Sequence, residues 1–333
     1  MTQLILDRYR PLGLLGSGGE ADVLVAFDEQ MKRRVAIKCV PLSDTHASAS
    51  AIEEARTAAM LNHPNIVTMY DFAVTDDHAY AYLIMEYIDG LALADIASED
   101  LTDEIIASVV RDVGDALVFA HKNGVLHLDI KPANIIIDHE GLAKVIDFGV
   151  SALSQVSGMP TATAGTVGYM PLEQLTAQKV SPATDQWAYA AVVYELLTDE
   201  FPYEEEFVAA RTLRRAPSDL IIMQRLQGAE EPNLIQLESS TLNETFAQAL
   251  SRMPQSRFVA VKDLRRVLLG ELPAPRSGRK QLAQIVSTLT TDDEEPVEHE
   301  AERRPSPFSG CVSTLVLATL SVVGLLFLLS SLM

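Results

Sequence analysis

Six short motifs follow one another along the chain and carry residues suited to handling phosphate. Gly16 and Gly18 would let backbone amides approach phosphate oxygens closely, because no Cβ intervenes. Lys38 lies in an apolar run, where a lysine is costly to bury unless it is paired. The motifs are L-G-S-G-G-E-A-D-V (15–23), V-A-I-K (35–38), Glu54, H-L-D-I-K-P-A-N (127–134), D-F-G (147–149) and G-T-V-G-Y-M-P-L-E (165–173). Their order and spacing point to a phosphoryl-transfer site.

Each motif taken alone has a simpler interpretation. The glycine-rich segment could be a hairpin turn, and Lys38 a solvated lysine on an edge strand. D-I-K-P could be a surface turn, and Asp147 an aspartate between a strand and a turn. The apolar run at 135–137 favours the catalytic interpretation of the preceding segment.

The elements that would position these residues can be read from hydrophobic patterns. Residues 35–40 and 79–87 are apolar runs of strand length, and residues 48–61 form an alanine-rich helical stretch. Further helices are expected at 102–123 and 182–197, the second with Ser181 as N-cap and Pro182 in its first turn. The chain therefore changes from strand-rich to helix-rich near residue 88.

Over roughly residues 9–269, the motifs resemble the eukaryotic-like Ser/Thr protein kinase family, particularly its bacterial (Hanks-type) members. The resemblance implies an α+β, bilobal protein-kinase fold. The small β-rich lobe would span about 9–88 and the larger helical lobe about 89–270. The expected activity is transfer of the γ-phosphoryl group of ATP to Ser or Thr hydroxyls of proteins, including the kinase itself.

Two motifs would supply the catalytic and metal-binding residues in such a kinase. Asp129 would accept or orient the substrate hydroxyl proton, and Lys131 would neutralise the γ-phosphate. Asn134 and Asp147 would ligate Mg²⁺, with Mn²⁺ as the alternative ion. Lysine two positions after the aspartate is the usual choice in Ser/Thr kinases.

The ATP site would be built mainly from the first lobe. The resemblance implies that Lys38 holds the α- and β-phosphates and is anchored by Glu54, with Glu53 as the alternative. Met85 would occupy the gatekeeper position before the hinge that binds adenine. The residues expected to line the site are Leu15, Gly16, Ser17, Gly18, Gly19, Ala21, Val23, Ala36, Lys38, Glu54, Met85, Glu86 and Ile88.

The resemblance also assigns structural and regulatory residues. Glu173 should pair with Arg257, and Asp185 should support the backbone of the catalytic loop. Thr166 matches the threonine that contacts the catalytic aspartate and lysine. Thr161 and Thr163 are candidate autophosphorylation sites or ordinary loop threonines.

Three positions depart from the family pattern. Ala21 replaces the third glycine, and M-P-L-E replaces the usual A-P-E triplet. Leu128 stands where most members carry an arginine that pairs with a phosphorylated loop residue. Leucine cannot form that pair, which puts regulation through this contact in doubt.

Composition limits the class of partner. The chain has 333 residues and a net charge of −20, which argues against nucleic acid as a partner. Its two cysteines, Cys39 and Cys311, offer neither a disulfide framework nor zinc-site spacing. The N-terminus lacks the pattern of a signal peptide. Oligomeric state, including a homodimer, is left open.

The C-terminal region predicts a membrane tether. Residues 311–333 carry no charge and are long enough to cross a bilayer, although a buried soluble helix is the alternative. Arg303 and Arg304 favour a cytoplasmic N-terminal side. Residues 271–310, rich in proline and acidic residues, read as a linker. We therefore expect a tail-anchored, single-pass protein of the bacterial inner membrane, with a eukaryotic setting left open.

Two other functions remain as alternatives. A pseudokinase scaffold would bind nucleotide or partners without turnover, and the departures at Ala21, Leu128 and M-P-L-E favour it. A small-molecule kinase of related fold is disfavoured by G-T-V-G-Y, because protein kinases use that region to dock an extended peptide. The retained polar residues of the catalytic motifs favour a protein kinase.

Overall fold

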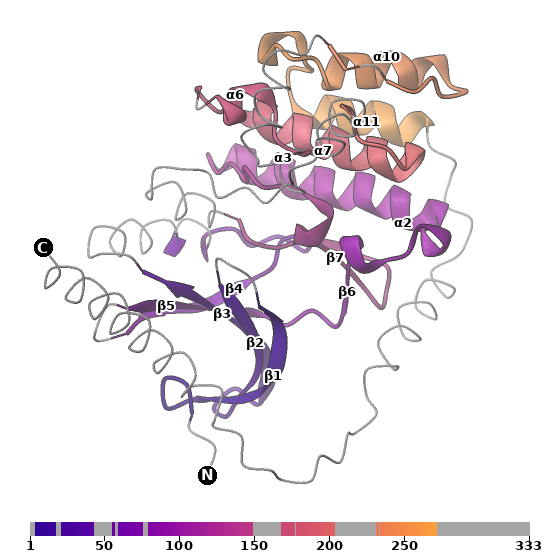
Figure 1. Ribbon diagram of the computed structural model, residues 1–333. Coiled ribbons are helices and arrows are strands. Elements are labelled where there is room, and N and C mark those ends of the chain that lie inside the picture. The colour runs from indigo at the N-terminus through magenta and orange to yellow at the C-terminus, as the bar shows by residue number, and fades with distance from the viewer. Residues whose placement is uncertain are drawn as a thin grey trace, which may run out of the picture. The chain divides into compact units, whose positions relative to one another are not determined.

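Five antiparallel strands near the N-terminus form one sheet in the order β1-β2-β3-β5-β4 (Figure 1). The computed structural model describes residues 4–17, 21–42, 55–56, 59–75, 79–148, 168–176, 178–203, 231–232 and 234–271. The strands are β1 (Tyr9–Ser17), β2 (Asp22–Asp28), β3 (Arg33–Pro41), β4 (Met69–Val74) and β5 (Tyr80–Glu86). The strands predicted at 35–40 and 79–87 are confirmed as β3 and β5.

Side chains of consecutive residues face opposite sides of this sheet, as the two-residue period of a strand requires. Val35, Ile37 and Ile84 are fully buried in a cluster on one face. Ala36 and Met85 belong to a separate cluster, and both are about 7% exposed. Lys38, two positions after Ala36, therefore projects from this second face.

A second sheet contains three short strands, and its middle strand begins directly after the H-L-D-I-K-P-A-N motif. They are β6 (Gly90–Ala92), β7 (Ile135–Asp138) and β8 (Ala143–Val145), and all pair antiparallel. Three-residue helical turns lie at η1 (Leu93–Asp95), η2 (Ser98–Asp100), η4 (Pro132–Asn134) and η5 (Pro254–Ser256). The pairing of β7 with β8 places the two ends of this hairpin, residues 134 and 146, beside each other.

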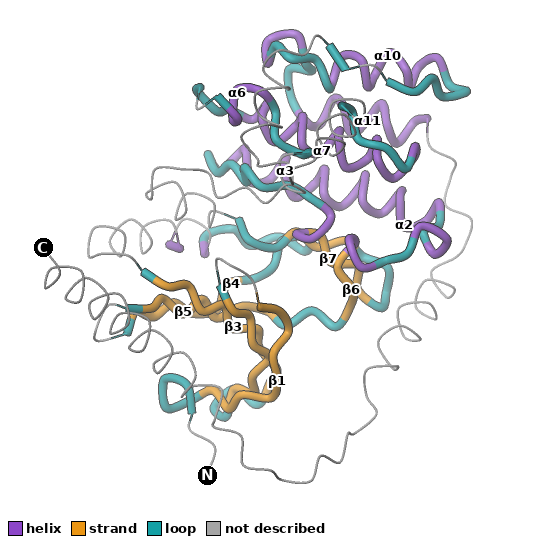
Figure 2. The backbone as a smooth tube through the Cα atoms, in the orientation of Figure 1, coloured by secondary structure: helices purple, strands orange, loops and turns teal. Residues whose placement is uncertain are grey.

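The helices come after the first sheet in the chain and group together away from it, as Figure 2 shows, whereas β7 and β8 lie between α3 and α6 in the sequence. They are α2 (Asp103–Ser108), η3 (Val109–Val113), α3 (Gly114–Lys122), α6 (Leu172–Leu175), α7 (Pro182–Thr198), α10 (Ser240–Ala249) and α11 (Val261–Glu271). This division into a strand-rich and a helical part confirms the predicted α+β lobes.

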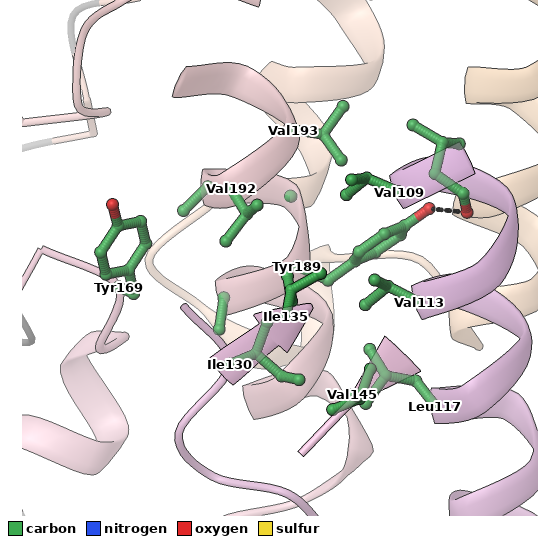
Figure 3. Packing of buried hydrophobic residues seen from close by; sticks show 14 of the residues in the cluster. Val109, Val113, Leu117, Ile130, Ile135, Val145, Tyr169, Tyr189, Val192 and Val193 are labelled. Atoms are coloured by element: carbon green, nitrogen blue, oxygen red, sulfur yellow. Dashed lines mark hydrogen bonds between the residues drawn. The ribbon is translucent and has the colours of Figure 1, made fainter. Parts of the chain in front are cut away.

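The helix predicted at 182–197 is confirmed as α7, with the expected cap. The Ser181 hydroxyl accepts a hydrogen bond from the Ala183 amide, and Thr184 bonds back to the Ser181 amide. Residues 184–194 of α7 are all buried, which explains why residues 187–194 are apolar on every side of the helix. Tyr189 lies fully buried among aliphatic side chains of the core (Figure 3).

The helix predicted at 102–123 contains a π-helical turn, η3, between α2 and α3. Here the Val110 carbonyl accepts a bond of 2.6 Å from the buried Tyr189 hydroxyl (Figure 3). The Arg111 carbonyl accepts a bond of 3.0 Å from Arg265 of α11. A Cβ on Gly114 would lie 2.6 Å from the Arg265 Cδ, so this crossing requires a glycine. The wide turn thus accommodates bonds from two other helices.

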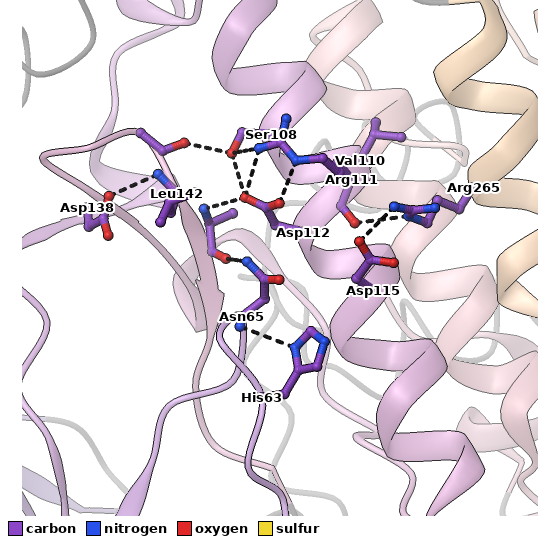
Figure 4. A network of polar contacts seen from close by, with 12 residues as sticks. His63, Asn65, Ser108, Val110, Arg111, Asp112, Asp115, Asp138, Leu142 and Arg265 are labelled. Atoms are coloured by element: carbon purple, nitrogen blue, oxygen red, sulfur yellow. Dashed lines mark hydrogen bonds and ion pairs between the residues drawn. The ribbon is translucent and has the colours of Figure 1, made fainter. Parts of the chain in front are cut away.

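A buried carboxylate within η3 joins this helix to the second sheet (Figure 4). Asp112, 4% exposed, accepts hydrogen bonds from Ser108, Arg111 and the Ala143 amide of β8. The Asn65 amide donates to the Ala143 carbonyl at 3.1 Å. These bonds satisfy the buried polar groups at the edge of β8.

Several predicted segments lie outside the described residues. Most of the helix at 48–61, and the linker and span at 272–333, belong to this group. Within the described ranges, no helix combines the length and apolar character that crossing a membrane requires. The tether therefore stays a prediction from the sequence.

Candidate active site

Lys38 and Asp147 meet, although 109 residues separate them. The Lys38 Nζ lies 2.6 Å from the Asp147 Oδ2, and the side chains are 14% and 21% exposed. The strand β3 presents the lysine, and Asp147 follows β8 with a left-handed φ of 66°. Glu54, the predicted partner of Lys38, lies outside the described residues. Among the described residues, Lys38 pairs with Asp147, and the pairing with Glu54 stays a prediction.

Asp129 forms a compact polar group with two other predicted residues. The Lys131 Nζ lies 2.8 Å from the Asp129 Oδ2. The side-chain amide of Asn134 (Nδ2) donates to the same oxygen at 2.8 Å and to the Asp129 carbonyl at 2.8 Å. This orientation of the Asn134 amide leaves its oxygen as the atom that could ligate a cation.

Main-chain bonds bring the Asp129 group next to Asp147. The Asn134 carbonyl accepts a bond of 3.0 Å from the Ile146 amide, and Ile146 directly precedes Asp147. His127 Nε2 lies 2.9 Å from the Ile146 carbonyl, and His127 Nδ1 accepts from the Asp129 amide at 3.2 Å. The fully buried His127 ring thus spans the two motifs.

Asp185 supports the backbone of the loop that leads into Asp129. Its carboxylate accepts bonds from the His127 amide at 2.9 Å and the Leu128 amide at 2.7 Å. The same carboxylate lies 2.7 Å from the His121 Nε2, and Asp185 is fully buried. Leu128 has a φ of 63°, a conformation that costs a leucine about 1–2 kcal/mol. The two amide bonds hold the loop in this conformation just before Asp129.

The residues expected to contact nucleotide share one face of the first sheet. Val23 pairs with Lys38 across β2 and β3, and Ala36 pairs with Met85 across β3 and β5. Val23, Ala36 and Met85 belong to the same apolar cluster. Gly16 pairs with Val23, and a Cβ on Gly16 would meet open space.

Other predicted ATP-site residues are placed less fully. Leu15 of β1 is 50% exposed, and Ile88 after β5 is half-buried. Ala21 immediately precedes β2. Gly18, Gly19 and the Ser17 side chain lie outside the described residues. The roles of these positions remain predictions.

Glu86 turns its side chain toward the second sheet. It pairs with Lys144 of β8 and accepts a bond of 3.2 Å from the Thr68 amide. The Glu86 amide donates to the Thr68 carbonyl at 2.8 Å. Glu86 therefore ties the end of β5 to β8. Lys144 was missed in the sequence, although it is a lysine in an apolar strand, the same signal that singled out Lys38.

Glu173 and Arg257 form the expected ion pair. Arg257 Nη1 and Nη2 lie 2.7 and 3.0 Å from the two carboxylate oxygens of Glu173. The side chains are 0% and 3% exposed. This pair fixes α6, the short helix after the predicted activation loop.

Tyr169 of the G-T-V-G-Y motif is also anchored. Its hydroxyl donates to Glu195 of α7 at 2.6 Å, and its ring packs against Phe201. Burial, followed by the Glu195 charge, raises the pKa of Tyr169 well above its usual range. Thr161, Thr163 and Thr166 lie outside the described residues, so their roles remain predictions.

Gln174 makes a contact with Leu128 that the sequence did not predict. Its amide donates to the Leu128 carbonyl at 2.6 Å. No pattern in the sequence distinguishes this glutamine from one facing solvent. It contacts the loop before Asp129 from α6, which the neighbouring Glu173–Arg257 pair anchors.

The residues present fit a nucleoside triphosphate and a magnesium ion. The open space beside Gly16 could admit a phosphate, and the Lys38 ammonium could balance its charge. Among the described residues, no three His, Cys, Asp or Glu side chains form a metal site. A cation held by Asp147 and Asn134 would need further oxygen ligands. Mg²⁺ bound through one or two protein groups, phosphates and water meets this condition.

The geometry agrees with a comparison to known proteins, in which the protein kinase domain matches residues 9–268. The chain belongs to the protein kinase family. The match covers the first sheet, the catalytic loop and the helices up to α11. The bilobal fold of that family accounts for the strand-rich and helical parts described above.

Several curated relatives are bacterial. The serine/threonine-protein kinase PknB of Mycolicibacterium smegmatis is 30% identical over 348 aligned positions, covering 96% of this chain and 54% of the relative. PknB of Mycobacterium tuberculosis is 33% identical, covering 81% and 44%. The serine/threonine-protein kinase PrkC of Bacillus subtilis is 30% identical, covering 87% and 44%. The chain thus spans about half the length of these relatives.

Proposed function

We propose that this chain is an ATP-dependent Ser/Thr protein kinase. The observation that carries the proposal is the convergence of two polar groups, Lys38–Asp147 and Asp129–Lys131–Asn134, on either side of Ile146. The names of the relatives support Ser/Thr rather than another acceptor. A phosphoryl-transfer site needs mainly positioning and charge neutralisation, and this arrangement supplies both.

Each polar group has one task in this proposal. Among the described residues, the side-chain contacts of the Asp129 carboxylate go to Oδ2, so we assign Oδ1 to the substrate hydroxyl. Lys131, 2.8 Å away, balances charge on the transferred group. Asp147 and Asn134 hold Mg²⁺ (or Mn²⁺), and Lys38 holds phosphate oxygens. When bound, the ATP–Mg²⁺ complex supplies the phosphoryl group and a leaving group.

We also propose that the kinase is held at a membrane. The support is the uncharged run at 311–333, preceded by an acidic, proline-containing linker at 271–310. The catalytic part, residues 9–270, would then lie on the cytoplasmic side of a bacterial inner membrane. Its substrates would be proteins with Ser or Thr within reach of the linker.

The test uses the full chain and the variants Asp129→Asn and Asp147→Ala, with Asp103→Asn as a control at an exposed carboxylate of α2. Membranes are separated by sedimentation, and each fraction is incubated with labelled ATP and Mg²⁺. We expect phosphoserine or phosphothreonine in the parent and the control, at least 100-fold less in the other two variants, and activity in the membrane fraction.

The outcomes separate the parts of the proposal. Nucleotide binding without transfer by the parent would indicate the pseudokinase scaffold. Equal signals from all four proteins would contradict the assigned site. Activity found only in the supernatant would contradict the membrane tether and leave the kinase assignment intact.

A further inference from the structure

The residue before the catalytic aspartate is held on both of its main-chain groups. Leu128 is left-handed, with a φ of 63°. Its amide donates to the buried Asp185 at 2.7 Å, and its carbonyl accepts from Gln174 at 2.6 Å. The carbonyl belongs to the peptide group that leads directly into Asp129. A change at this carbonyl would therefore rotate the Asp129 backbone.

Gln174 reaches this carbonyl from a helix that a buried ion pair anchors. α6 has only four residues, but its Glu173 forms the buried ion pair with Arg257. The Gln174 amide therefore approaches the loop from a fixed position. Asp185 approaches from α7, so the two supports of Leu128 come from different elements.

Because residue 128 is a leucine, the Gln174–Leu128 hydrogen bond becomes more important for holding the loop in its left-handed conformation. A leucine cannot pair with a phosphate, so no charged side chain at this position can draw the loop toward the segment before α6. A leucine also resists positive φ, whereas a glycine accepts it. The left-handed conformation must therefore be maintained by contacts from outside the loop.

We propose that Gln174 is a positioning residue for phosphoryl transfer, which holds the Leu128 carbonyl and thereby sets the orientation of Asp129. This inference rests on the proposed kinase function. It links α6, the end of the segment expected to dock substrate, to the catalytic aspartate by a main-chain contact. The side chain itself touches neither nucleotide nor substrate in this assignment.

The experiment compares the full chain with Gln174→Met and Gln174→Glu. Both variants keep the length of the side chain, but neither an ionised carboxylate nor a thioether can donate to the carbonyl. Gln178→Met makes the same change at an exposed glutamine outside α6. The maximal autophosphorylation rate, the KM for ATP and the Tm are measured for each protein.

We expect both Gln174 variants to lower the maximal rate about tenfold, with a KM for ATP within twofold of the parent and a Tm close to that of Gln178→Met. Leu128→Gly supplies a second test. Because glycine tolerates positive φ, adding Gln174→Met to Leu128→Gly should lower the rate less than threefold. A purely structural role would not produce this dependence on residue 128.

Two results would overturn the inference. One is a maximal rate within twofold of the parent in Gln174→Met or Gln174→Glu. The other is the same tenfold loss in the Leu128→Gly background. The proposed function fails separately, if the parent itself transfers no phosphate or if Asp129→Asn is as active as the parent.

Discussion

The ion pairs Lys38–Asp147 and Glu173–Arg257 have similar lengths but different surroundings. Arg257 donates five hydrogen bonds, two to Glu173 and the others to carbonyls of Ser251, Ala183 and Arg252. These use all five of its N–H groups. Among the described residues, Lys38 contacts one carboxylate oxygen with an ammonium that has three donors.

The difference separates a structural pair from a pair available to a ligand. Glu173–Arg257 is completely buried and has no remaining donor to offer. Lys38–Asp147 is partly exposed and retains donors and an oxygen that could turn to a nucleotide and cation. Saturation of hydrogen bonds, rather than distance, therefore distinguishes the pair that could bind a ligand from the structural pair.

The largest expected effect on activity comes from breaking the pair Lys38–Asp147, which we call the open pair because, among the described residues, it retains free donors. Lys38→Met should lower phosphoryl transfer by at least 100-fold, because the phosphates lose their ammonium partner. The Tm should change by no more than about 2 °C, since partly exposed ion pairs contribute little to stability. Lys262→Met, at an exposed lysine of α11, is the control for activity and Tm. A large drop in Tm for Lys38→Met would show that this pair is structural as well.

Breaking Glu173–Arg257, which we call the closed pair because all its donors are used, should instead lower stability. Arg257→Met leaves the Glu173 carboxylate buried without its partner, which typically costs about 3–5 kcal/mol. We expect the Tm to fall by roughly 10 °C, as measured by calorimetry. The double variant Glu173→Leu with Arg257→Met removes both charges and should recover most of that loss. If the double variant is no more stable than the single one, an unpaired charge is not the cause.

The sequence predicted those parts of the site that depend on local patterns. The apolar run around Lys38 predicted the strand, but the face that the lysine takes is known only from the structure. Ser181 and Pro182 predicted the start of α7 to the residue. The Glu173–Arg257 pair joins residues 84 apart, and only the resemblance to a family suggested it.

Contacts that depend on how elements pack could not be predicted. The π-helical turn at Val109–Val113 coincides with bonds from Tyr189 and Arg265, which belong to distant helices. Gln174 reaches Leu128 only after α6 has been oriented. Periodicity describes which face of an element is apolar, but it contains no information about such side-chain directions.

A third ion pair, Arg8–Asp28, tests whether saturation also controls the response to pH. Asp28 is 1% exposed and accepts bonds from Arg8 Nε, Arg8 Nη2 and the Gln30 and Met31 amides. The Arg8 hydrogen bond is the main cause that lowers the pKa of Asp28 from 3.8 to about 2. Because the folded-state pKa is depressed, the carboxylate stabilises the fold above the unfolded pKa. That contribution is lost as the pH falls from about 5 through 2.

We therefore expect Asp28→Asn to remove about 2 kcal/mol of this pH-dependent stability, the smallest of the three effects. Urea unfolding of parent and variant should show a difference in free energy that shrinks as the pH falls from 5 to 2. Glu29→Gln, at a neighbouring carboxylate whose pKa is lowered by hydrogen bonds from Arg10 and Lys32, should show a smaller pH-dependent difference, because these ion pairs face solvent. A difference for Asp28→Asn that stays constant with pH would mean that this saturated carboxylate keeps its ordinary pKa. Saturation would then not distinguish Arg8–Asp28 and Glu173–Arg257 from the open pair Lys38–Asp147.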